Sequence, residues 1–371
     1  MMNEMQQEAG DNSQQIQNKM ENCIVVVNGI DEKRAREICD EKILALQNEL
    51  TEVAMNKAEE RVRYFNNDLI TRMKEIENSF EVLREPAFHF MLKEAQKTAA
   101  RTERPADYKL LSELLLRRIE IGNNTNVKAG IKRAIEIVDE VSDESLTALT
   151  LSLAIIGCNL FSGSIFQGLD TLDNLFEKIL DRHLPNSIDN EWIDNLEIVG
   201  TIRISQIGKL YTFETICSNT MSGYCVAGIK KDSDNYKKAV EMLNCFKLPF
   251  STLYTNELNE EYVRLPVASE NLIETLQITT TIPIDDLQTT GKLHLPISEE
   301  QKKILHEIYS MYDNDSGLLK SIQEIFNKEI EKRKNLKIAK DWWNNIPIAF
   351  NLTSVGRSLA YANLKRIDPQ L

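Results

Sequence analysis

The stretch 31–85 contains neither glycine nor proline, and this most constrains what the chain can fold into. Apolar residues recur along it at steps of three and four, which is typical of a coiled coil or a long amphipathic helix. A helix of that length would span about 80 Å at ~1.5 Å per residue, too long for one small domain to cover its apolar stripe. The sequence therefore predicts self-association, or a long partner helix, through Ile43, Leu46, Leu50, Val53, Val62, Phe65, Leu69, Met73, Ile76 and Phe80.

The heptad pattern slips near Lys57, which indicates either a stutter or a break in this helix. Asp31 stands where a helix cap is expected, and Pro86 is the first strong breaker after it. We therefore expect a helix that begins after Asp31 and continues to residue 85.

Beyond Pro86 the chain alternates short apolar-periodic segments with proline, glycine and capping residues, which predicts a series of helices. Among them we expect a helix over 270–279 and one unbroken helix from about 315 to 343. Runs at 201–204 and 348–352 predict strands, and Thr353 predicts the cap of a last helix that ends near Lys365. The predicted fold class is mostly α with minor β: a long N-terminal helix or coiled coil, a multi-helix domain and a small winged-helix-like C-terminal α/β piece.

The pattern divides the 371 residues into four segments. Residues 1–30 are polar, and we expect them to be partly disordered with a short β run. Residues 31–85 form the long helix or coiled coil. Residues 86–200 form a helical domain, and 201–371 form an α-rich C-terminal region with the winged-helix-like end.

Charge and cysteine usage narrow the function classes. The net charge is −13, so the chain lacks the basic balance of a general nucleic-acid binder. The six cysteines form no C-x-x-C pair, and the first twenty residues lack an apolar core of the kind that a signal peptide needs. These features predict a cytoplasmic protein with free thiols.

Motifs for metal or cofactor chemistry are missing from the sequence. None of the four histidines lies three to five residues from another histidine or a cysteine, so no helix-borne metal pair is expected. The segment Gly223–Lys230 imitates a phosphate loop, but Ile229 stands where the lysine should follow the glycine. We expect no cofactor and no metal.

Two patterns leave other functions open. Arg84 and His89 match the Arg-x4-His spacing of helical ribonucleases, in which the histidine acts as acid or base beside a phosphate-stabilising arginine. The alternative is a structural histidine at a helix start. Residues 145–169 carry no charge, which allows a membrane-acting effector, although their serines and glycines favour a buried core helix.

Three stretches resemble an uncharacterised bacterial family of about this length, whose members are similar to the abortive-infection alpha proteins linked to phage defence. The first comprises 10–17, 27–30 and 35–38, the second is 110–117, and the third is 351–360. The Leu-Thr-x-x-Gly core of the third also resembles the helix–wing region of winged-helix domains. The resemblance implies a role in defence and transfers no catalytic residue.

These observations favour a non-enzymatic, self-associating interaction protein over the ribonuclease and membrane alternatives. The expected partners are further copies of the chain and a protein whose identity the sequence does not give. Strong signals for nucleic-acid or membrane binding are lacking.

Overall fold

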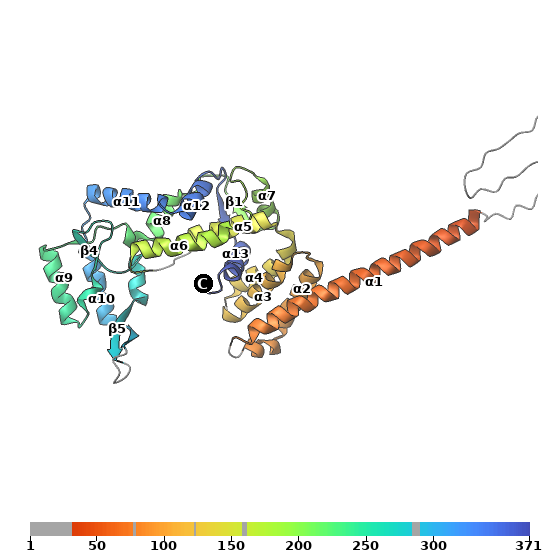
Figure 1. Cartoon of the computed structure of the whole chain (residues 1–371), viewed down its shortest axis with the longest axis horizontal. Helices are drawn as coiled ribbons and strands as arrows, with labels where there is room; N and C mark the ends of the chain where they lie inside the picture. Colours follow the sequence, from red (N-terminus) through yellow and green to blue (C-terminus); the bar gives the residue numbers. More distant parts are fainter. Residues whose placement is uncertain (1–31, 77–78, 122–123, 158–161, 284–289) are drawn as a thin grey trace, which may run out of the picture. The chain divides into compact units, whose positions relative to one another are not determined.

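The computed structural model describes residues 32–371 apart from 77–78, 122–123, 158–161 and 284–289. The described chain is mostly helical with a few short strands, so the predicted fold class, mostly α with minor β, is confirmed (Figure 1). The predicted cap at Asp31 and the predicted segment 1–30 lie outside the described residues. The α-helices are α1 Glu32–Met73, α2 Pro86–Arg101, α3 Pro105–Glu120, α4 Thr125–Ile137, α5 Asp143–Gly157, α6 Ile165–Leu180, α7 Glu191–Ile198, α8 Phe213–Thr220, α9 Asp234–Cys245, α10 Glu299–Ser310, α11 Ser316–Glu331, α12 Lys334–Asn344 and α13 Ser354–Ile367.

Short 3-10 helices and strands fill the connections between these helices. The 3-10 helices are η1 Ser79–Arg84, η2 Val138–Glu140, η3 Ser222–Tyr224, η4 Phe250–Thr252 and η5 Glu270–Thr275. The strands are β1 Ile202–Ile204, β2 Ile229–Lys230, β3 Tyr254–Thr255, β4 Tyr262–Arg264, β5 Gln277–Pro283, β6 Thr290–Pro296 and β7 Phe350–Leu352. All pairings are antiparallel: β1 with β7, β4 with both β2 and β3, and β5 with β6.

Contacts within the chain divide it into two compact units, residues 1–57 and 58–371, and the division falls inside α1. The described part of the first unit is the helix from Glu32 to Lys57. The second unit holds the rest of α1 and all other elements. The four segments expected from the sequence remain a prediction.

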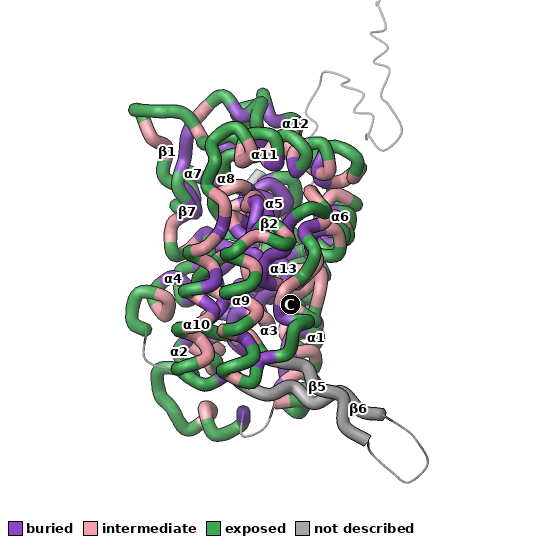
Figure 2. The backbone as a smooth tube through the Cα atoms, turned by 90° about the vertical axis from the view of Figure 1, so that its left-hand side faces the viewer, coloured by how far each residue is buried: buried purple, intermediate pink, exposed green. Residues whose placement is uncertain are grey.

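The main core of the second unit is built around α13, which contacts α3, α4 and α5. Leu359 and Ala360 of α13 are fully buried, as are Leu111 and Leu114 of α3. Figure 2 shows α5 and α13 buried along most of their length. The helix α13 is therefore a central element of the core, and it presents few side chains to a partner.

The uncharged run 145–169 divides between α5 and the start of α6. Almost every residue of α5 from Ser145 to Ile155 is buried. The hydroxyl groups of Thr147, Thr150 and Ser152 donate to carbonyls one turn earlier, as in the bond from Thr150 Oγ1 to the carbonyl of Leu146 at 2.6 Å. Within the parts of the chain that the structure describes, none of the helices combines the length and the apolar character that a membrane crossing requires.

A second, smaller core lies between α9, α10, η5 and the strands β2 and β4. Its buried members include Leu243 from α9, Val263 from β4 and Leu305 from α10. A capping box at Ser298 and Gln301 begins α10.

Three expected elements differ from the structure. The first helix ends at Met73 and not at residue 85, and a turn and η1 follow it, with Ser79 Oγ donating to the carbonyl of Met73. The expected helix at 270–279 is the 3-10 helix η5, because the chain enters β5 at Gln277 and pairs with β6.

The third difference concerns the long helix expected from about 315 to 343, which is broken into α11 and α12. Arg333 adopts an extended conformation there, and Asp173 of α6 accepts the backbone N–H groups of Asn335 and Leu336 at 2.9 Å each. A side chain remote in sequence thus caps α12, so the break has no strong local signal.

Candidate functional site

The helix α1 runs through Lys57 without a break and carries eight of the ten predicted self-association residues, whereas Ile76 and Phe80 follow its end. The ten residues separate into two groups. In the first group, the side chains of Ile43, Leu50 and Val53 are 55%, 58% and 46% exposed. Leu46 belongs to the same heptad series, but its side chain lies outside the described residues. We call Ile43, Leu46, Leu50 and Val53 the outer stripe.

The second group contributes to the core of the residue 58–371 unit. Phe65, Leu69 and Met73 are buried in the main core, with Val62 half-buried beside Phe65. Ile76, after the helix end, is also half-buried. The sixth member, Phe80, is exposed on η1. We call Val62, Phe65, Leu69, Met73 and Ile76 the inner stripe.

Polar contacts hold the inner half of α1 in place. Arg72 forms an ion pair with Glu113 of α3 and another with Asp68 one turn earlier, at 2.9 Å. The guanidinium of Arg61 donates to the carbonyl of Ala100 at the end of α2, at 3.1 Å. This half of α1 is therefore a structural helix of the second unit, and its stripe is already covered by the same chain.

The slip of the heptad pattern near Lys57 explains why the predicted residues divide into an outer and an inner stripe. The inner stripe begins at Val62, which lies outside the heptad register of the outer stripe. The outer stripe continues instead through Lys57, Glu60 and Tyr64, which are all exposed. One helix therefore presents one apolar face to its own core and a different one to solvent.

The ribonuclease candidates Arg84 and His89 both lie on the surface. Arg84 ends η1 and pairs with Glu81 at 3.7 Å, and His89 occupies the first turn of α2, where its backbone N–H donates to the carbonyl of Glu85. Both side chains are exposed, and among the contacts of the described residues none joins them.

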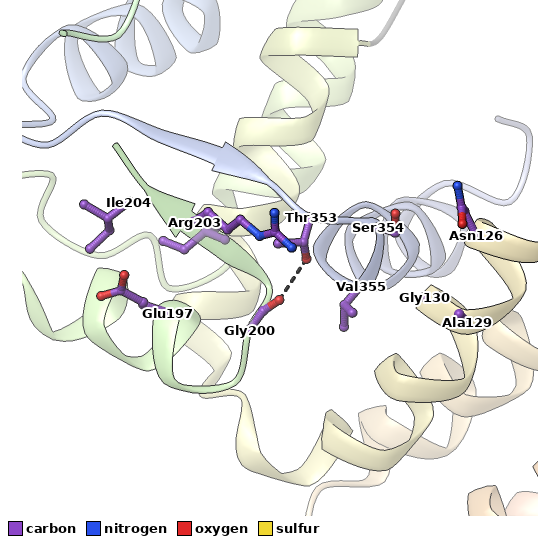
Figure 3. Close-up of a pocket in the computed structure, with 11 residues that line it drawn as sticks. Asn126, Ala129, Gly130, Glu197, Gly200, Arg203, Ile204, Thr353, Ser354 and Val355 are labelled. Carbon is purple, nitrogen blue, oxygen red and sulfur yellow. Dashed lines mark hydrogen bonds between the residues drawn. The ribbon is translucent and has the colours of Figure 1, made fainter. Parts of the chain in front are cut away.

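An open cleft of about 640 Å³ lies where α4, α7, β1 and the start of α13 meet (Figure 3). Arg203 and Thr353 lie on one side of the beginning of α13, and Asn126 of α4 lies on the other. The lining residues are Asn126, Ala129, Gly130, Glu197, Gly200, Ile202, Arg203, Ile204, Thr353, Ser354 and Val355.

Close backbone approach shapes this cleft. Thr353 caps α13 by accepting the N–H of Gly356 at 3.2 Å, and its hydroxyl donates to the carbonyl of Gly200 at 2.8 Å. A Cβ on Gly356 would lie 2.1 Å from the carbonyl oxygen of Thr201, and one on Gly130 would lie 2.6 Å from that of Ser354. The Leu-Thr-x-x-Gly sequence is therefore explained by a helix cap followed by a glycine that permits this contact.

The charged groups of the cleft are the guanidinium of Arg203 and the carboxylate of Glu197. The lining contains no histidine or cysteine, so this cleft lacks an evident acid–base pair or thiol nucleophile. Sequence reasoning found the cap at Thr353 but not the cleft, because the pairing of Arg203 with Asn351 joins strands about 150 residues apart.

The thiols of Cys217, which is buried, and of Cys225, which is half-buried, are poor nucleophiles. Burial raises the pKa of Cys225 to about 12 and raises that of Cys217 further still. Over residues 32–371, leaving aside the gaps given above, the structure places no group of three or more His, Cys, Asp or Glu side chains so that they could hold a metal ion.

His306 forms the clearest titratable contact of the second core. Its Nδ1 lies 2.9 Å from Oε1 of Glu270, and its Nε2 lies 3.1 Å from Oε1 of Glu274. The hydrogen bond to Glu270, followed by that to Glu274, raises the pKa of the imidazole. The contact fastens η5 to α10 and is most favourable when the ring carries both protons.

A family model described as “:-like” matches residues 29–370, almost the whole chain. The chain belongs to this uncharacterised family. The match includes α1, which carries the stretch 35–38, and α3, which carries 110–117. It also includes β7 and α13, which together carry 351–360. Neither the curated proteins nor the solved structures contain a match to the chain.

Proposed function

We propose that this chain is a non-enzymatic interaction protein that self-associates through the outer stripe of α1. The observation that carries the proposal is the exposure of Ile43, Leu50 and Val53 at heptad positions of a helix that continues for 42 residues. A second helix packed along this row would cover these exposed apolar side chains.

The strength of association follows from the size of the stripe. Burying four apolar side chains from each of two copies releases on the order of 10 kcal/mol, at about 1–2 kcal/mol each. Association costs roughly 4–15 kcal/mol in lost translational, rotational and side-chain freedom. Pairing through the stripe alone is therefore weak and depends on concentration, as expected of an assembly that a partner or a high local concentration promotes.

Several features favour this function over the two alternatives. Arg84 and His89 are exposed, whereas catalytic groups of this kind act in a site that shields the reacting phosphate. About half of the uncharged segment that suggested a membrane effector belongs to α5, whose side chains are mostly packed inside the second unit. The resemblance to abortive-infection alpha proteins leads us to assign the protein to bacterial phage defence in the cytoplasm, with a second protein as trigger or target.

Light scattering coupled to size-exclusion chromatography tests self-association on the full chain over a range of concentrations. We expect an oligomer whose share rises with concentration, and Leu50→Asp with Val53→Asp should convert it to monomer because two charges would enter an apolar seam. Leu44→Asp with Met55→Asp is the matched control. Both residues are 59% exposed on the same helix, but they lie on the face opposite the outer stripe, so this pair should still associate.

A monomer at every concentration would overturn the proposal, and so would equal loss of association in the two double variants. The role in defence is measured separately, as the plating efficiency of phage on bacteria that express each variant. Protection by the parent and the control, but not by Leu50→Asp with Val53→Asp, is expected. No protection by the parent would remove the defence assignment.

A further inference from the structure

The charges that follow the outer stripe point to the orientation in which two copies pair, an inference that rests on the self-association proposed above. We infer that two α1 helices pair antiparallel, with Ile43 of each copy opposite Val53 of the other and Leu46 opposite Leu50. In this register the two helices cross at Asn48, and all four members of the outer stripe meet apolar partners.

The charges at the next inward positions oppose parallel pairing. After Val53 the heptad series continues through Lys57 and Glu60, which are both exposed. Parallel pairing in register would face Lys57 with Lys57 and Glu60 with Glu60 at the seam. Two like charges about 4 Å apart repel by ~1 kcal/mol in water and by more where the seam excludes water, so each such layer opposes parallel association.

Antiparallel pairing removes both conflicts. The sequence has Cys39 at the heptad position opposite Lys57 and Arg36 at the position opposite Glu60. Lysine then faces an uncharged residue and glutamate faces an arginine, and the two-fold axis repeats each arrangement twice. This arrangement has one unfavourable contact, because Glu49 of one copy lies near Glu49 of the other at the rim of the crossing. Charge pairs at an exposed rim are worth only a few tenths of a kcal/mol.

The place of the second unit along the chain also favours antiparallel pairing. The second unit begins at Ala58, five residues after the last member of the stripe, Val53. Parallel pairing would bring two units of 314 residues, 58–371, to the same end of an eleven-residue seam. Antiparallel pairing places them at opposite ends, where their excluded volumes do not compete.

Distances between spin labels on the full chain test this orientation. A label at Asn48, and in a separate sample a label at Arg63, is attached through a non-cysteine chemistry because the chain has six cysteines of its own. Both residues are exposed on α1, so the labels disturb neither the core nor the outer stripe. Antiparallel pairing predicts a short distance at Asn48, set only by the helix separation and the label length.

At Arg63 the antiparallel register predicts about 45 Å, because position 63 lies opposite position 33 and the two labels are then 30 residues apart at ~1.5 Å each. We expect a long distance between the labels at Arg63 and a short distance between those at Asn48, in a sample that light scattering shows to be a dimer. Short distances at both positions on a dimer would overturn the orientation while leaving self-association intact. A monomer without dipolar coupling would overturn the proposed function itself, and a larger oligomer with mixed distances at Arg63 would overturn the two-stranded arrangement.

Discussion

Replacing Gly356 by alanine should destabilise the second unit strongly, although the change adds only one methyl group. The new Cβ would lie 2.1 Å from the carbonyl oxygen of Thr201 and 2.9 Å from its carbonyl carbon. Thr201 is fully buried, its hydroxyl donates to the carbonyl of Leu196 at 2.8 Å, and its own carbonyl accepts the N–H of Thr353 at 3.0 Å. The clash can therefore be relieved only by moving backbone that is held on both sides.

The size of the effect follows from these contacts. Overpacking of a well-packed core costs about 1–3 kcal/mol, and a weakened hydrogen bond at Thr353 adds about 1 kcal/mol. We expect a loss of roughly 2–4 kcal/mol in the free energy of unfolding, measured by urea denaturation followed by circular dichroism. Gly130→Ala, which meets the backbone of Ser354 at 2.6 Å from the other side, should also destabilise the unit.

Gly157→Ala is the matched control for these two substitutions. Gly157 ends α5, is exposed, and would give its Cβ no neighbour within 4 Å. Alanine is favoured over glycine in a helix, so this variant should be unchanged or more stable by up to about 1 kcal/mol. If Gly356→Ala unfolds within about 0.5 kcal/mol of the parent, the backbone contact does not constrain the start of α13 and the reasoning is refuted.

Three further substitutions test other parts of the structure. The hydrogen bond to Glu270 raises the pKa of His306 in the folded protein. The stability that this contact contributes is therefore complete below the unfolded pKa of about 6.5, and it is lost as the pH rises through the higher folded pKa. Melting temperatures at about pH 6 and pH 8 should therefore differ more for the parent than for His306→Gln, and an equal difference would contradict the assignment. His89→Ala should leave both the melting temperature and any phage protection unchanged, whereas loss of protection without a change in melting would favour the ribonuclease alternative. Phe65→Ala should cost about 3–5 kcal/mol in urea denaturation, against less than about 0.5 kcal/mol for its exposed neighbour in Tyr64→Ala.

Local signals predicted much of the helical fold. Ser233, Ser298 and Thr353 each precede a helix and cap it through a side-chain oxygen, as their residue types indicate. Pro86 and Pro105 lie at the first positions of their helices, where a missing N–H has no cost. The last helix begins at Ser354, directly after the predicted cap Thr353.

The features that sequence did not predict depend on distant partners. The break between α11 and α12 depends on Asp173, and the cleft depends on the pairing of β1 with β7. Lys74, Glu75 and Ile76 are ordinary helix formers, and the first side chain that marks the end of α1 is that of Ser79, whose hydroxyl donates to the carbonyl of Met73. The pattern at 270–279 is compatible with a helix, but Gln277 and its successors pair with β6.

The outer and inner stripes show why periodicity located the important apolar residues but could not assign each of them to folding or to assembly. A step of three or four is satisfied equally by a helix face that packs on its own domain and by one that packs on another chain. Burial separates the two, because Phe65, Leu69 and Met73 are covered by the core of the second unit, whereas Ile43, Leu50 and Val53 are exposed. Phe65 thus belongs to folding, whereas Leu50 is available to assembly. If this division is correct, substitutions in the outer stripe change the mass by light scattering at unchanged stability of the second unit, and substitutions in the inner stripe change stability first.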